Sequence, residues 1–147
     1  MARIKIPMPE KFVFSTEIPI RIGDINYGNH LGHESFIVII AEARTRFFQS
    51  LGHAQAGTDG VDHIIADLGI MYLGQGYYGQ TLRVDIAVTD STDKGFDMVY
   101  EVTDAKTGLE LARAKTGLVF YDYRQQKTTS VPQDLREKLS KSKCISG

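Results

Sequence analysis

Side chains that can bind or transfer protons gather in a short polar stretch directly before an apolar run. They are Asp24, Asn26, His30 and His33. A carboxylate or a neutral imidazole can take a proton from water, whereas an amide holds a ligand only through hydrogen bonds. If a helix begins at His33, its first N–H groups have no partner and carry a partial positive charge. The backbone donors of this stretch therefore suit an oxygen-rich ligand.

Each of these side chains also has a structural interpretation. Asp24 can accept hydrogen bonds from N–H groups of its own loop, and His30 can cap the helix instead of acting as a base. Beyond its backbone N–H, His33 is expected to face solvent or a partner. Glu34 falls in the first turn of the helix, where a carboxylate favours the helix dipole without any catalytic role.

Glu42 interrupts the apolar run from Phe36 to Ala43. A lone charge within such a run is costly unless it is paired. Arg46 lies four residues further on, so the two side chains share one face of the helix and are expected to form an ion pair.

A long helix must position these residues. The run from Phe36 to Ala43 is apolar on nearly all sides, which predicts a covered helix from about His33 to Leu51, ended by Gly52. Period-two alternation predicts strands at residues 12–22, 81–89, 96–103 and 109–123, and an apolar run predicts another at 63–73. Pro19 places the first strand at an edge or a bulge. Loops are expected at 23–32, 57–60 and 74–80, and a short charged helix at 133–139.

This order of elements predicts one α+β domain that spans residues 1–147. Strand, long helix and four strands in meander order form an antiparallel sheet wrapped around one central helix. The inward set of the last strand is expected to be Ala112, Ala114, Thr116, Leu118 and Phe120. The opposite sheet face is expected to be wet, with Arg83, Asp85, Arg113 and Lys115 on it. Because a single sheet leaves the helix incompletely covered, we expect a homodimer or a homotetramer.

Composition and charge exclude several classes of protein. A net charge of -1 gives no field that attracts nucleic acid or an anionic membrane, and no apolar segment reaches the roughly 20 residues of a membrane helix. Four histidines and the remote Cys144 match no zinc site, so no metal or other cofactor is expected. Cys144 cannot form an internal disulfide and no targeting segment is apparent, which indicates a soluble, cytoplasmic protein.

The chain resembles the hotdog-fold acyl-CoA thioesterases, in particular the 4-hydroxybenzoyl-CoA thioesterase-like group. The likeness is most specific from Arg21 to Gly52, RIGDINYGNHLGHESFIVIIAEARTRFFQSLG, which is similar to the family signature Arg-x-x-Asp-x-Asp-x-x-Gly-His and the helix that follows it. It extends over about Ile18 to Leu139. The resemblance implies the hotdog fold and hydrolysis of an acyl-CoA to a free carboxylic acid and coenzyme A.

The resemblance also implies roles for individual residues. Asp24 falls on the first acidic position of the signature and His30 on its histidine. The backbone N–H of His33 falls on the oxyanion donor, and Gly32 before it permits close approach of a ligand. Asn26 stands at the second acidic position, where the family usually has its catalytic carboxylate.

This departure at Asn26 leaves the proton acceptor open, because an amide cannot take a proton from water. His30, Asp24 and Glu42 are the candidates, since some hotdog thioesterases use a carboxylate on the helix. Asn26 is then expected to hold the water or the thioester through hydrogen bonds.

Several residues further along the chain are candidates for substrate contacts. Coenzyme A phosphates need cations or N–H donors, which Arg83, Lys94, Arg113 and Lys115 can supply, although solvated strand positions explain these residues equally well. Asp67 of a partner subunit is a further candidate for the site. The remaining candidates, which pack or line a rim, are Tyr72, Tyr77 and Tyr78.

Two other functions stay open at this stage. The amide of Asn26 favours a noncatalytic protein that binds acyl-CoA or an acyl carrier. A hotdog dehydratase would instead need His30 and Glu42 to converge on one carbon of the substrate.

Overall fold

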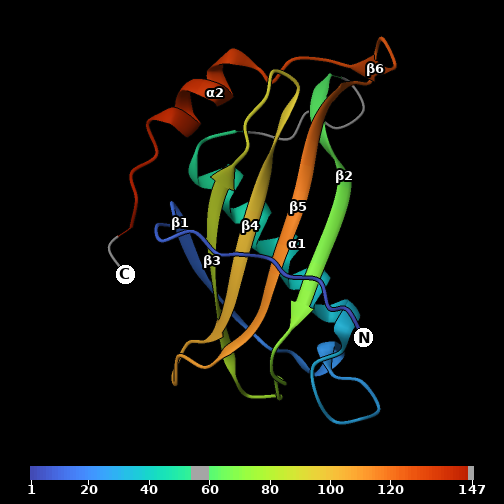
Figure 1. Cartoon of the computed structure of the whole chain (residues 1–147), viewed down its shortest axis with the longest axis vertical. Helices are drawn as coiled ribbons and strands as arrows, with labels where there is room; N and C mark the ends of the chain where they lie inside the picture. Colours follow the sequence, from blue (N-terminus) through green and yellow to red (C-terminus); the bar gives the residue numbers. More distant parts are fainter. Residues whose placement is uncertain (54–59, 146–147) are drawn as a thin grey trace.

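The computed structural model describes residues 1–53 and 60–145. An antiparallel sheet covers one long helix, which lies on a single face of that sheet (Figure 1). This arrangement confirms the predicted α+β architecture. The loop predicted at 57–60 lies, apart from Gly60, outside the described residues.

The element bounds agree closely with the sequence patterns. The strands are β1 (Phe14–Pro19), β2 (Val61–Tyr72), β3 (Thr81–Thr89), β4 (Gly95–Asp104), β5 (Glu110–Asp122) and the short β6 (Lys127–Thr128). The helices are η1 (Ile22–Asp24, one 3-10 turn), α1 (His33–Ser50) and α2 (Gln133–Ser140). The first strand is shorter than predicted, because the chain turns into η1 after Pro19.

The strand order corrects one part of the prediction. The order is β1-β3-β4-β5-β2, so β3, β4 and β5 form the predicted meander but β2 lies beside β5 at the far edge. The glycine-rich segment 73–80 carries the chain from β2 across the end of the sheet to β3, and the N–H groups of Leu73 and Gly74 donate to the Leu111 carbonyl on the way. Alternation identifies strands but not their neighbours. Pro19 sits on β1, the other edge strand, as predicted.

Helix α1 is held by its apolar face. Phe36, Ile40, Ala43 and Phe47 are at most 2% exposed, and they pack on a sheet face whose β5 residues are equally buried. The predicted inward set of β5 is confirmed, since Ala112, Ala114, Thr116, Leu118 and Phe120 are all at most 1% exposed. The helix ends where predicted, with Gly52 in the left-handed region at a φ of 71°.

The outer face of the sheet is less wet than predicted. The N-terminal segment crosses it on the side opposite α1 (Figure 1). Ile6 of this segment is 7% exposed, and the Arg3 guanidinium donates to the backbone carbonyl of Tyr72 at 2.8 Å. The segment therefore covers part of the polar face that the sequence pattern assigned to solvent.

Candidate active site

The start of α1 presents two free backbone donors. Gly32 is the N-cap and no side chain caps the helix, while the N–H groups of Ser35 and Phe36 both donate to the Gly32 carbonyl. Among the described residues, no acceptor lies within hydrogen-bond reach of the N–H groups of His33 and Glu34. Both residues are exposed. The two N–H groups can therefore bind a carbonyl oxygen that becomes negative.

The loop before the helix is seated by backbone hydrogen bonds. Gly32 N–H donates to the Asp24 carbonyl at 3.1 Å, and a bridge pairs Ile25 with Leu31. Leu31 N–H donates to the Gly76 carbonyl at 2.7 Å, which ties this loop to the 73–80 segment. The helix start is thus held on two sides by ordered backbone, not by side-chain caps.

Asn26 and His30 lie together in the turn at the tip of this loop. The Asn26 side-chain oxygen accepts the Gly28 N–H at 2.9 Å, and the His30 Nδ1 lies 3.2 Å from the Leu31 carbonyl oxygen. A Cβ on Gly28 would lie 3.3 Å from the Asn26 oxygen and 3.0 Å from His30 Nε2, so both side chains fold over that glycine. The amide oxygen of Asn26 is therefore already engaged in the turn.

The Asp24 carboxylate accepts hydrogen bonds from its own segment of the chain, as its structural interpretation predicts. One carboxylate oxygen accepts the backbone N–H of Arg21 at 2.8 Å, and the other lies 3.5 Å from the Arg21 guanidinium. Asp24 as a whole is 8% exposed. Water activation by this carboxylate would require it to release an established pair of contacts.

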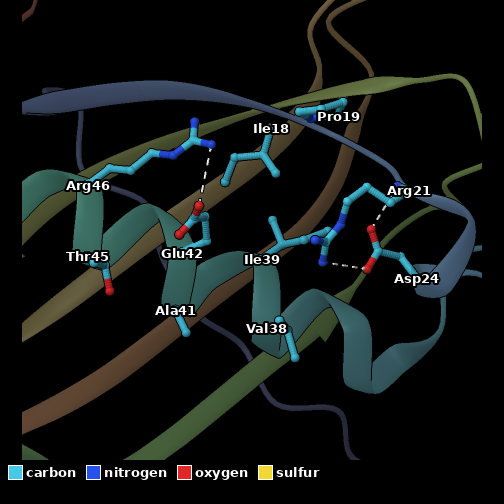
Figure 2. Close-up of a pocket in the computed structure, with 10 residues that line it drawn as sticks. All are labelled: Ile18, Pro19, Arg21, Asp24, Val38, Ile39, Ala41, Glu42, Thr45 and Arg46. Atoms are coloured by element: carbon cyan, nitrogen blue, oxygen red, sulfur yellow. Dashed lines mark hydrogen bonds and ion pairs between the residues drawn. The ribbon is translucent and has the colours of Figure 1, made fainter.

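Asp24 and Glu42 line one groove between the end of β1 and the outward side of α1 (Figure 2). The groove has a volume of about 470 Å³ and an apolar floor that includes Ile18 and Ile39. Figure 2 shows an ion pair at each end, Arg21 with Asp24 and Arg46 with Glu42. The groove can accept an apolar chain with polar groups at both ends.

Glu42 forms the ion pair that its spacing predicted. Its carboxylate lies 3.5 Å from the Arg46 guanidinium, which also donates to the Thr16 hydroxyl and the Glu17 carbonyl on β1. The pair therefore ties α1 to the edge strand. The residues that line the groove include Glu42 but not His30, so the two groups that a dehydratase would need lie in different parts of the described structure.

Tyr72 contacts the start of α1, and the sequence patterns did not predict this contact. Its hydroxyl donates to the His33 carbonyl at 2.8 Å, and its ring packs edge-on against Phe36 with 5.3 Å between ring centroids. Burial, and secondarily the negative charge of Glu34, raises the pKa of Tyr72 above its ordinary value of 10.0. Tyr72 ends β2 beside the start of α1, and only the tertiary fold brings those positions together.

The predicted phosphate-binding residues lie on β3 and β5 and carry partners of their own. Arg83 lies 3.0 Å from Asp85, Arg113 lies 2.9 Å from Glu110, and Lys115 lies 2.7 Å from Asp67. These hydrogen-bonded pairs raise the pKa of Arg113 and of Lys115. Coenzyme A binding by these residues stays a prediction, and their pairing gives each one a structural role. Lys94 lies in the turn before β4, 3.4 Å from the Thr128 hydroxyl.

Two further features bear on ligand classes. In the part of the chain that the structure describes, no three His, Cys, Asp or Glu side chains are grouped so that they could hold a metal ion. Within the same residues, no helix is both long and apolar enough to cross a membrane.

Comparisons with solved structures identify the fold. The 1,4-dihydroxy-2-naphthoyl-CoA thioesterase from Synechocystis is 19% identical with a TM-score of 0.82, over 89% of this chain and 96% of that chain. The DHNA-CoA thioesterase from Staphylococcus aureus is 21% identical with a TM-score of 0.78, over 86% and 88%. The 12:0-ACP thioesterase from Umbellularia californica is 18% identical with a TM-score of 0.75, over 91% of this chain but 54% of that chain. These likenesses confirm the hotdog fold.

Comparisons at the level of sequence identify the family. A search among curated proteins finds no match to this sequence. A family model described as the thioesterase-like superfamily, in contrast, matches residues 20–139. That range includes the polar loop, all of α1 and the strands β2 to β6 of the sheet. Because the model covers most of the chain, the protein belongs to the thioesterase-like superfamily.

Proposed function

We propose that this protein hydrolyses acyl-CoA thioesters and releases a free carboxylic acid and coenzyme A. The observation that carries the proposal is the pair of free N–H groups at His33 and Glu34. The thioester oxygen binds there, and the helix dipole stabilises the negative charge that forms when water attacks. The family supports thioester hydrolysis, and its relatives include enzymes named for CoA thioesters.

The side chains around the helix start fit an attack by water. Asn26 and His30 share one turn, so Asn26 orients the water or the thioester while His30 is one candidate proton acceptor. Asp24 and Glu42 are the other predicted acceptors, and each is engaged with an arginine. The 470 Å³ groove beside them is a candidate channel for the acyl chain.

Release of free thiol tests the proposal directly. Purified protein is incubated with a panel of short, long and aromatic acyl-CoAs, and coenzyme A is measured with a thiol reagent. Cys144 is exposed and reacts with such a reagent, so a Cys144→Ser variant removes the background. We expect turnover above buffer for at least one acyl class. Absence of turnover for every class contradicts the proposal.

Asn26 favours one alternative, a protein that binds acyl-CoA or an acyl carrier without hydrolysis. In that case ligand raises the melting temperature while no thiol is released. The Asn26→Asp variant separates the two functions. A large gain in hydrolysis marks a dormant thioesterase site, whereas a loss of hydrolysis shows that the Asn26 amide itself contributes to the reaction.

A second copy of the chain is part of the proposal. β2 is an edge strand whose Ile64, Ile65 and Leu68 are 36%, 40% and 40% exposed. On α1, Ile37 and Val38 are also exposed, at 37% and 56%. An exposed apolar edge strand invites pairing, and covering it together with the helix completes the core.

A further inference from the structure

We propose that Glu34 is the carboxylate that activates water in this protein, in place of the acid that Asn26 replaces. The inference rests on the proposed thioesterase function. It assigns the chemistry to a residue whose position in the first helical turn suggested only a favourable interaction with the helix dipole.

The Glu34 side chain folds back over the start of its own helix. A Cβ on Gly32 would lie 2.5 Å and 3.0 Å from the two Glu34 carboxylate oxygens. The carboxylate therefore occupies the space that only a glycine leaves open at the N-cap, the residue that directly precedes the two free N–H groups. Its side chain is 63% exposed, so water reaches it.

The charged and titratable groups around Glu34 come from three elements. On α1 itself, His33 Nδ1 lies 3.2 Å from a Glu34 oxygen. From β2, Tyr72 is close enough that the Glu34 charge raises the pKa of its phenol, and its hydroxyl is directed at the His33 carbonyl. From the N-terminal segment, Arg3 binds the backbone carbonyl of Tyr72. Among the described residues, no lysine or arginine forms an ion pair with Glu34, and the His33 imidazole is the one basic side chain within 4 Å of its carboxylate.

The other candidate carboxylates are less suited to act at this point. Asp24 is buried and accepts hydrogen bonds from Arg21. Glu42 is paired with Arg46 and lies eight residues beyond Glu34, about 12 Å further along the helix axis. Among these three, Glu34 is the carboxylate that lies beside the free amide donors and is open to water.

Tyr72 holds the donors in position. The peptide unit that contains the His33 carbonyl also contains the Glu34 N–H, so the Tyr72 hydrogen bond fixes the direction of that N–H and polarises it. Tyr72 is accordingly a positioning residue for the oxyanion site.

The proposed step is a hydrolysis in which Glu34 takes and returns one proton. The Glu34 carboxylate removes a proton from water as the water oxygen bonds to the thioester carbon. The resulting oxyanion is held by the N–H groups of His33 and Glu34. The C–S bond then breaks, and the leaving thiolate takes the proton from the Glu34 carboxylic acid. The products are the carboxylic acid and free coenzyme A.

Three substitutions test the inference in the full chain. Glu34→Gln keeps the size of the side chain but removes the base, and we expect kcat to fall at least about 100-fold with a much smaller change in KM. Glu34→Asp restores part of the loss. Gly32→Ala leaves Glu34 in the chain but displaces its carboxylate, and we expect kcat to fall while the fold is kept, because the displaced group is the end of a flexible side chain.

A matched control comes from the second helix. Asp134 is the first-turn carboxylate of α2, and Asp134→Asn removes the same kind of helix-dipole interaction far from the site. We expect this control to change the melting temperature about as much as Glu34→Gln does, with kcat within threefold of the wild type.

The pH profile distinguishes a base from a structural carboxylate. In the wild type kcat declines toward acidic pH as the base is protonated, and in Glu34→Gln that acidic limb disappears. If the wild type hydrolyses acyl-CoA but Glu34→Gln keeps kcat within threefold, or keeps the same acidic limb, the assignment of Glu34 is wrong and the proposed function stands. If the wild type releases no thiol, the proposed function fails and the inference with it.

Discussion

At the residue scale, Asn26 decides how the family chemistry applies to this chain. The sequence places this amide where the family carries a catalytic acid, and the structure engages its oxygen with the Gly28 N–H. An amide in that position can hold a turn or a water, but it cannot take a proton. The hydrolysis proposed here therefore requires a neighbouring group as the base, and our proposal assigns that role to Glu34 in the first turn of α1.

The Tyr72 hydroxyl provides a residue-scale prediction. Tyr72→Phe keeps the ring contact with Phe36 but removes the hydrogen bond to the His33 carbonyl. We expect a loss of about 1 kcal/mol in the free energy of unfolding, measured in urea, and a fall in kcat that exceeds the change in KM. Unchanged kcat in a folded variant would show that the hydrogen bond does not position the oxyanion donors.

Much of the residue-scale picture was predictable, and the rest depended on tertiary contacts. The pattern of a glycine before an apolar run correctly placed the helix start at His33, so its free N–H was predictable. The contact from Tyr72 was not, since it joins residues 39 positions apart. The approach of the Glu34 carboxylate to Gly32 was also not predictable. Sequence spacing shows on which face of a helix a residue lies, but it does not determine the side-chain rotamer.

At the element scale, the sheet depends on close approach of its backbones. Gly95 opens β4, and a Cβ there would collide with the backbone carbonyl of Leu118 on β5. Alternation correctly predicted these strands, because their inward residues follow a period of two. The placement of β2 at the far edge was not predictable, because a flexible glycine-rich connection can reach either neighbour.

The Gly95 contact predicts a large effect of a small substitution. Gly95→Ala is expected to lower the free energy of unfolding by about 3 kcal/mol, since the obstructing atom belongs to the backbone and cannot move aside. Gly23→Ala is the control, because no atom lies within 4 Å of its Cβ, and its expected effect is within about 0.5 kcal/mol. Urea unfolding of both variants measures the difference. Equal free energies of unfolding for Gly95→Ala and Gly23→Ala would contradict the predicted collision at Gly95.

A row of charges across three strands predicts a pH dependence of stability. Glu101 on β4 stands opposite Asp85 on β3 and Arg113 on β5. Burial, followed by its hydrogen bond and charge interaction with Glu110 and by the Asp85 charge, raises the pKa of Glu101 from 4.5 to about 7, against the opposing effect of Arg113. Glu101 and Asp85 line a small cavity, and the charged side chains of Arg83 and Glu10 line it as well.

The sign of this effect follows from the proton count. Between pH 4.5 and about 7 the folded state holds a proton that the unfolded state has lost, so the Glu101 contribution to stability declines as the pH rises through this window. Glu101→Gln is expected to raise stability at pH 8 by about 1 kcal/mol after allowance for solvent screening, and to change it little at pH 4.5. Melting curves at both pH values test this; equal shifts at the two values would contradict it.

At the scale of the whole molecule, one sheet face covers α1 and the other is crossed by the N-terminal segment (Figure 1). The α+β architecture was predictable, because a helix that is apolar on most sides needs a sheet around it. The covering of the outer face by residues near Ile6 was not, because that segment has no periodic pattern. Exposed apolar side chains include Ile64, Ile65 and Leu68 along β2 and Ile37 and Val38 on α1.

This exposed edge predicts that the molecule is at least a dimer. Sedimentation is expected to give at least twice the mass of one chain. Ile65→Lys places a charge on the β2 edge and is expected to weaken self-association at least tenfold. Leu109→Lys is the control, since Leu109 is 61% exposed in the turn before β5, away from that edge. A wild-type protein that sediments as a monomer would contradict the prediction.

The central claim is that the first N–H groups of α1 bind a thioester oxygen that becomes anionic. The most direct test is a crystal structure with a nonhydrolysable thioester analogue of coenzyme A. The account predicts that the carbonyl oxygen of the analogue lies about 2.7 to 3.1 Å from the backbone nitrogen of His33, with the Glu34 carboxylate beside the reacting carbon. An analogue bound with its carbonyl away from the start of α1 would contradict the account.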